Sequence, residues 1–372
     1  MICDMLKVIM SKSGGKDTTA DKKWVSYFDF LRVLAAMAVV LIHVSCKGWV
    51  KIQIGSLGWW GATFWDGATR WAVPIFVMIS GALMLNPEKK FSVKKLYSKN
   101  ILRMVIIFAV WSILYILFSI FVLKNDFKGF VDVIKNFFGG YYHMWFIYML
   151  IGLYIITPVL RVIVRKQTVM EYFLIVGILL SIILPGIKSL CDGYLLVEEN
   201  KIVGLVSSAI GSVTGSLGFK FAAGYVLYYV LGYWLSKVEV SKAIRCICYI
   251  LGICGLILTV LYTGRVTILS QRLWGIFESA TPWVLAQAAA LFIFARYHCE
   301  RIGRNKIVKT ISFLSLGIYL IHAGVIEFLL LYVCPDIKYN FVNILIMSGI
   351  VFAISALLTW IIKKIPLVKN IV

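Results

Sequence analysis

The chain reads YFDFLRVLAAMAVVLIH over residues 27–43, a stretch apolar enough to form the core of a transmembrane helix. Similar apolar runs recur along all 372 residues, and the composition is 61% hydrophobic with only 15% charged residues. That balance is far from the balance found in soluble domains. The sequence therefore predicts an all-α integral membrane protein with about ten transmembrane helices.

Apolar runs flanked by turn or charge signals give the expected spans. They are approximately 26–46, 68–86, 101–123, 144–163, 172–188, 218–236, 245–263, 281–297, 311–333 and 341–362. The amphipathic segment 127–138 is expected to be a helix lying in the membrane interface, and the Gly- and Ser-rich stretch 203–217 a surface or re-entrant loop. The domains are then a basic N-terminal segment at 1–23, a transmembrane domain at 24–364 and a tail at 365–372.

The formal charge of +21 comes mainly from short blocks of Lys and Arg between the apolar runs. Such blocks stay on the cytoplasmic side of a membrane, so both termini are expected to be cytoplasmic. The basic residues are expected to lie next to the lipid bilayer and not to bind nucleic acid. The eight cysteines show no metal-ligand spacing, and no metal site is expected. Cys46, Cys191 and Cys334 fall near the same predicted outer face, which leaves one disulfide open.

The first span contains two titratable side chains that are costly inside a bilayer, Arg32 and His43. They are eleven residues apart, so a helix places them on one face, separated by ~16 Å along its axis. Asp29 lies one turn before Arg32 and is suited to pair with it. Two structural explanations stay open: Arg32 reaching from the helix end to the headgroups, and His43 bonded between helices.

This pair also suits a chemical purpose, the transfer of an acyl group from a thioester to a hydroxyl. That reaction needs a base with a near-neutral pKa, which histidine supplies. If the donor is acyl-coenzyme A, its phosphates need cations, and arginine offers them forked donors.

The run from Asp29 to His43 resembles the Arg-x10-His signature of the membrane-bound acyltransferase-3 family, whose members acylate carbohydrates and other envelope molecules. Three later segments resemble the family in the same order: Val73 to Leu83, His143 to Pro158, and Gly317 to His322. The resemblance covers residues 24–364. One departure is the entry to the third span, where Lys99 and Arg103 stand in place of a basic pair.

The resemblance implies an O-acyltransferase of the bacterial inner membrane that uses acetyl-coenzyme A as co-substrate and a carbohydrate or glycolipid as acceptor. It implies His43 as catalytic base and Arg32 as a residue for donor binding or site integrity, with Arg103 and Lys99 as further donor cations. Direct transfer and an acyl-histidine intermediate both stay open. The competing class is a transporter or flippase of an envelope glycan or lipid-linked intermediate.

Six further residues are candidates for binding the acceptor, and each also has a structural explanation. Aromatic side chains stack on sugars but also anchor helices at the interface, and histidines bond between helices. Acidic and basic side chains at helix ends are often only solvated. The six are His143, Trp145, Tyr148, Arg70, Glu278 and His322.

Overall fold

The structure is a computed structural model that describes residues 25–216, 224–335, 337–366, 368 and 371–372. These residues form helices joined by turns and loops, with no strand among them, so the predicted all-α membrane fold is confirmed. The predicted segment 1–23 and the start of the predicted span 218–236 lie outside the described residues. The helices are α2 (Tyr27–Trp49), α3 (Leu57–Thr69), α4 (Ala72–Met84), α5 (Val93–Lys95), α6 (Leu102–Phe121), α7 (Phe130–Gly139), α8 (Trp145–Ile163), α9 (Gln167–Ile178), α10 (Leu184–Leu195), α11 (Lys201–Ser216), α12 (Tyr225–Lys237), α13 (Lys242–Ser270), α14 (Pro282–His298), α15 (Glu300–Gly303), α16 (Lys306–Phe328) and α17 (Phe341–Lys364).

Eight helical stretches in the described chain are long and apolar enough to cross a membrane. They are Tyr27–Trp49, Leu57–Met84, Val93–Phe121, Trp145–Ile163, Gln167–Leu195, Lys242–Ser270, Lys306–Val333 and Phe341–Lys364. Helices α12 and α14 lie at two further predicted spans but have only 13 and 17 residues. The expected total of ten spans therefore stays a prediction.

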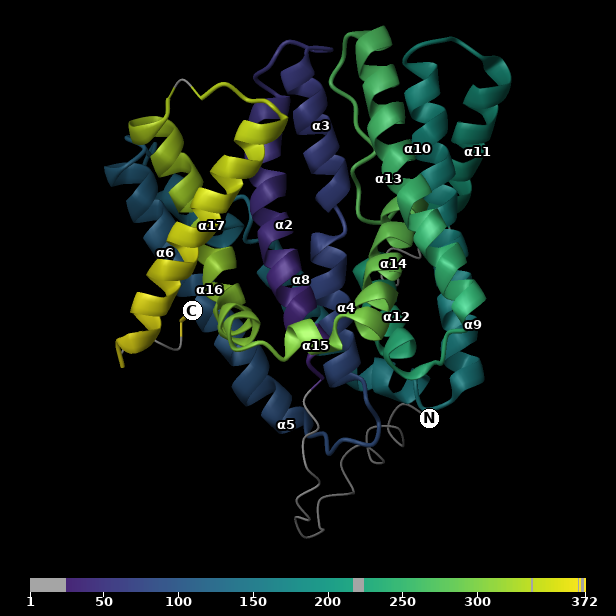
Figure 1. The fold of residues 1–372 in the computed structure, drawn as a ribbon, viewed down its shortest axis with the longest axis horizontal. Coiled ribbons are helices and arrows are strands. Elements are labelled where there is room, and N and C mark those ends of the chain that lie inside the picture. The colour runs from purple at the N-terminus through teal and green to yellow at the C-terminus, as the bar shows by residue number, and fades with distance from the viewer. Residues whose placement is uncertain (1–24, 217–223, 336, 367, 369–370) are drawn as a thin grey trace.

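Helix α2 lies near the centre of the bundle, between α3 and α4 on one side and α16 and α17 on the other (Figure 1). The connections from α4 to α5, from α8 to α9 and from α14 to α16 lie at one end of the bundle, at the bottom of Figure 1. We call this the basic end because those connections contain Lys89, Lys90, Arg165, Lys166, Arg301 and Arg304. Helix α2 starts there and ends at the opposite end.

Helices α4 and α12 approach each other so closely that their backbones touch. A Cβ atom on Gly81 would collide with the carbonyl of Tyr229, and one on Gly232 would collide with the carbonyl of Met78. Small residues allow such close approach between membrane helices, where packing and weak polar contacts replace the hydrophobic effect as the driving force. The two glycines therefore fix the distance between α4 and α12.

Residues 271–281 return into the bundle as an extended segment beside α13 and lead into α14 (Figure 1). Side chains satisfy its backbone: Thr267 donates to the Trp274 carbonyl at 2.8 Å, and the Ile276 amide donates to Thr263 at 3.3 Å. The indole of Trp283 donates to the Ile276 carbonyl at 2.7 Å. Irregular backbone is tolerated at membrane depth only with such partners.

Two sequence predictions about local structure need correction, and the disulfide that the sequence left open is absent among the described cysteines. Residues 201–216 form helix α11 rather than a loop; it packs on α10, where Ser207 donates to Asp192 and Gly211 contacts Lys188. The second apolar stretch begins at Leu57, since α3 precedes α4. All described cysteines are free, so Cys46, Cys191 and Cys334 form no disulfide with one another.

The helix predicted over 127–138 is confirmed as α7, which begins at Phe130 and ends at Gly139. Its apolar side chains Phe130, Val131 and Phe138 are exposed. Its position in the membrane interface stays a prediction.

Candidate active site

Three of the four histidines in the chain meet near the opposite end of the bundle. They come from α2 (His43), from the residue before the first turn of α8 (His143) and from α16 (His322). The ring centroids of His43 and His143 each lie 5.1 Å from that of His322 and 6.5 Å from one another. The ring of Tyr142 lies 5.1 Å from that of His43. We call His43, His143 and His322 the histidine cluster.

Two members of this cluster are buried with ring nitrogens that lack a hydrogen-bond partner among the described residues. His143 is 1% exposed and His322 is 0% exposed. Neither nitrogen of His143 has a partner, and neither does Nε2 of His322. The Leu320 carbonyl lies near the His143 ring and accepts a hydrogen bond from the Tyr115 hydroxyl at 2.7 Å. Buried polar atoms normally have partners, so these nitrogens mark a place suited to a ligand or water.

The hydrogen bond of His322 decides which of its nitrogens is a base. Its Nδ1 lies 2.6 Å from the Tyr319 carbonyl oxygen. A carbonyl only accepts, so Nδ1 holds the proton, and Nε2 of the neutral ring is an acceptor with no partner among the described residues. The described residues hold no group of three or more His, Cys, Asp or Glu side chains placed to bind a metal ion.

The other predicted residue of α2, Arg32, lies toward the basic end. Its guanidinium donates to Asp29 at 3.3 Å, as the sequence predicted, and Asp29 also accepts from Ser312 of α16 at 2.6 Å. Tyr154 of α8 lies within electrostatic range of both Arg32 and Arg103. The Arg32 side chain is 24% exposed, so it is held on one side and open on another.

An internal cavity of about 130 Å³ lies between these two levels of α2. Val39 forms part of its wall, and helical geometry places Val39 on the same face as Arg32 and His43. Helices α4, α8 and α16 complete the wall with Val73, Phe76, Ser80, Phe146, Leu150, Ser315, Leu316 and Tyr319. The Tyr319 hydroxyl donates to the His143 carbonyl at 2.5 Å, which joins this wall to the histidine cluster.

If the donor is acetyl-coenzyme A, as the family resemblance implies, Asp29→Asn is expected to raise the KM for it about tenfold, with less effect on kcat. The variant keeps the shape of the side chain but removes the charge that holds Arg32, and a hydrogen bond to a charged group is worth about 1.5–3 kcal/mol. Steady-state kinetics with varied donor concentration measure this. Ser312→Ala is the matched control, since it removes the hydrogen bond from Ser312 to Asp29 and spares the ion pair between Asp29 and Arg32. An unchanged KM in Asp29→Asn would contradict the role of Asp29 in positioning Arg32.

Two charged residues that the sequence did not single out, Lys47 and Glu327, lie beside the histidine cluster on the side away from the basic end. Lys47, one turn beyond His43 on α2, forms an ion pair with Glu327 of α16 at 2.6 Å. The Lys47 ammonium also lies 5.9 Å from the ring centroid of Tyr142. The signal was available, because Lys47 and Glu327 are charged residues at or beside apolar spans.

Comparison with protein families gives the class of this arrangement. The family model for the acyltransferase domain of the acyltransferase-3 family matches residues 25–361, nearly the whole chain. The chain belongs to the acyltransferase-3 family. A search of curated proteins and a search of solved structures gave no match. The protein is thus a multi-pass membrane acyltransferase, and the histidine cluster and the cavity lie inside its matched domain.

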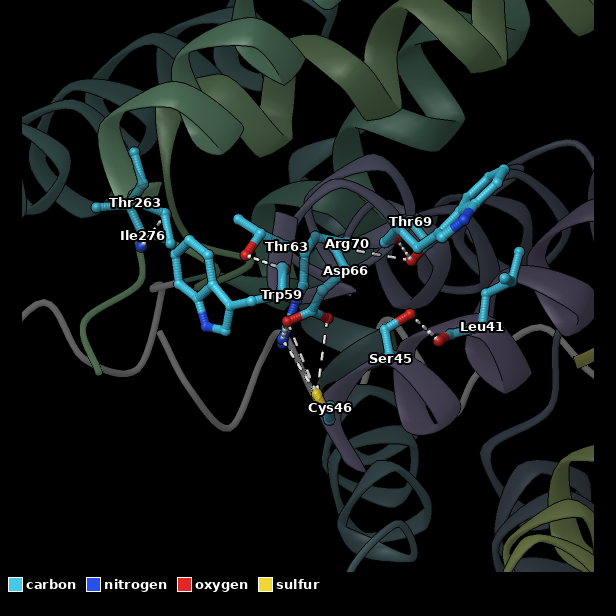
Figure 2. A network of polar contacts seen from close by, with 11 residues as sticks. Leu41, Ser45, Cys46, Trp59, Thr63, Asp66, Thr69, Arg70, Thr263 and Ile276 are labelled. Carbon is cyan, nitrogen blue, oxygen red and sulfur yellow. Dashed lines mark hydrogen bonds and ion pairs between the residues drawn. The ribbon is translucent and has the colours of Figure 1, made fainter. Parts of the chain in front are cut away.

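In this acyltransferase, Arg70 lies in a network of polar contacts (Figure 2), and its predicted role in binding the acceptor stays a prediction. It lies at the turn between α3 and α4 and forms an ion pair with the fully buried Asp66. Cys46, three residues beyond His43, lies 3.6 Å from the guanidinium and 3.7 Å from the carboxylate. The guanidinium also lies 4.6 Å from the ring centroid of Phe277. This network joins α2, α3 and the returning segment.

Of the remaining predicted acyltransferase residues, none has a described contact with His43. The Tyr148 hydroxyl donates to the Phe138 carbonyl at 2.6 Å and so ties α7 to α8. The Trp145 ring lies 5.6 Å from Tyr225. Glu278 is exposed on the returning segment, and Lys99 is exposed near the basic end. Their roles in binding stay predictions.

Proposed function

We propose that the protein transfers an acetyl group from acetyl-coenzyme A to a hydroxyl of a cell-envelope glycan or glycolipid. The observation that supports this proposal is the histidine cluster with its unpartnered nitrogens, joined by Tyr319 to a cavity beside Val39 of α2. This arrangement suits a donor whose phosphates are bound by cations near Arg32 and whose thioester reacts near His43.

The donor enters at the basic end. Its phosphates pair with Arg32 and Arg103, which both lie near Tyr154. The pantetheine arm extends past Val39 through the cavity, and the ~16 Å between Arg32 and His43 along the helix is of the same order as that arm. The thioester then lies beside His43.

In the chemical step, a ring nitrogen of His43 removes the proton of the acceptor hydroxyl. The alkoxide attacks the thioester carbon, a C–O bond forms, and the C–S bond breaks. The coenzyme A thiolate leaves and takes the proton from His43, so the histidine returns to its neutral form. Nε2 of His322 is the acceptor that orients His43 or shares its proton through a water molecule, consistent with the 5.1 Å between the rings.

Purified protein given acetyl-coenzyme A labelled in its acetyl group tests the reaction class. The expected result is time-dependent transfer of label to an acceptor in an envelope extract. Movement of unmodified glycan across vesicles without transfer of label would instead indicate a transporter. Envelope glycans from a strain lacking the protein are expected to be lighter by the mass of one acetyl group per site.

A further inference from the structure

A pocket of about 400 Å³ lies at the opposite end of the bundle, beyond the histidine cluster. Its described lining residues come from the turn after α2, from the helical stretch Leu329–Val333 that continues α16, and from the connection to α17. Two of them are lysines and none is acidic: the set is Lys51, Ile52, Leu330, Pro335, Ile337, Lys338 and Tyr339. Both lysines are exposed.

A continuous series of contacts leads from this pocket to His43. The Tyr339 ring packs against Gly48, where an added Cβ would lie 2.8 Å from a ring carbon. Gly48 adjoins Lys47, whose ammonium pairs with Glu327 and lies near Tyr142. Tyr142 in turn contacts His43.

The Tyr339 hydroxyl is a second observation that indicates a ligand. It is buried and has no hydrogen-bond partner among the described residues, although Tyr339 lines the pocket. Burial raises the pKa of this phenol, and the neighbouring carboxylate of Glu327 raises it further. The hydroxyl is therefore a neutral donor, beside two ammonium groups that also only donate.

The described charges at the pocket favour an anionic occupant; Asp336, between Pro335 and Ile337, lies outside the described residues. Lys47 is neutralised by Glu327 at 2.6 Å, whereas Lys51 and Lys338 have no described acidic partner. Two cations and one phenolic donor suit a group with several acceptor oxygens and a negative charge. A volume of 400 Å³ is in the range of small-molecule sites.

We propose that this pocket binds the acceptor through an anionic group, a phosphate or carboxylate next to the sugar hydroxyl that is acylated. The anion lies between Lys51, Lys338 and the Tyr339 hydroxyl. The hydroxyl to be acylated extends past the Lys47–Glu327 pair toward His43. This assignment rests on the proposed function, because it places the acceptor on the side of His43 away from the donor cavity.

The test measures binding, so that it does not depend on turnover. Full-length protein in phosphatidylcholine nanodiscs is titrated with α-glucose 1-phosphate and, in a separate experiment, with neutral methyl α-glucoside. Saturation-transfer NMR measures the binding of each sugar. We expect binding of the phosphorylated sugar at least about tenfold tighter than binding of the neutral one. We expect Lys51→Gln/Lys338→Gln to lose that difference and Tyr339→Phe to weaken it.

Lys94→Gln/Lys95→Gln is the matched control, since it removes two exposed lysines from the basic end. Equal binding of the two sugars, no binding of the phosphorylated sugar, or unchanged binding in Lys51→Gln/Lys338→Gln would each overturn the proposal. Nanodiscs containing phosphatidylglycerol separate the sources of the anion: competition by this lipid identifies a headgroup, and its absence identifies a soluble or glycan anion. Label transfer without preferential binding of the phosphorylated sugar would overturn this assignment alone, whereas preferential binding without label transfer would overturn the acyltransferase proposal, so the two failures are distinct.

Discussion

The His43→Ala variant is expected to transfer acetyl groups roughly 10²- to 10⁴-fold more slowly than the parent protein, the range typical for loss of a general base. His43 is the member of the histidine cluster that lies on the same helical face as the cavity wall residue Val39. It also contacts Tyr142, on the acceptor side. In the proposed function, His43 therefore acts between the donor and the acceptor.

The measurement is the initial rate of label transfer from acetyl-coenzyme A, with purified variant and parent proteins that are equally monodisperse. His298→Ala is the matched control, because the fourth histidine lies at the end of α14 against Phe294, away from the cluster. It is expected to keep the parental rate. Normal turnover by His43→Ala would remove this residue from the mechanism and leave His322, with its free Nε2, as the next candidate base.

The Gly81→Ala variant is expected to lose at least about 3 kcal/mol of stability, at the upper end of what overpacking costs. The added methyl group meets the Tyr229 carbonyl, which is backbone in the middle of α12 and cannot rotate away. The two helices must separate, and the loss extends to the reciprocal contact between Gly232 and Met78. The thermal unfolding temperature of the detergent-solubilised protein measures this.

Gly152→Ala provides the matched control for this substitution. Gly152 is also helical, in α8, but a Cβ there would have no atom within 4 Å. Alanine is the better helix former by up to about 1 kcal/mol, so this variant is expected to be as stable as the parent or more stable. Equal unfolding temperatures for Gly81→Ala and Gly152→Ala would show that α4 and α12 do not depend on their close approach.

The sequence predicts the helical class and the α2 geometry well because both depend on local periodicity. Helix α2 is unbroken from Tyr27 to Trp49. Arg32 and His43 therefore share a face, because a separation of eleven residues is about three helical turns. The pairing of Arg32 with Asp29 is likewise a local contact. A single helix contains all the information for these features.

The assembly of the site was not predictable in the same way. His143 and His322 were candidates for acceptor binding, but their meeting with His43 joins three segments that lie far apart in the chain. Helix α3 was missed because its glycines, threonines and Asp66 lower its hydropathy, although Asp66 is neutralised by Arg70. From the sequence alone, a charged residue whose partner is not yet known indicates a loop, even when the fold buries it in an ion pair.

The returning segment 271–281 also constrains how the protein is made. Its peptide groups depend on Thr263 and Thr267 of α13, and on Trp283, which follows it in the chain. Unpaired peptide groups cost several kcal/mol each in hydrocarbon. The segment is therefore expected to take up this conformation only after α13 has been inserted and the first residues of α14 have been synthesised. The contact between Phe277 of this segment and Arg70 can therefore form only after the chain has been synthesised as far as Trp283, long after the residues of α2.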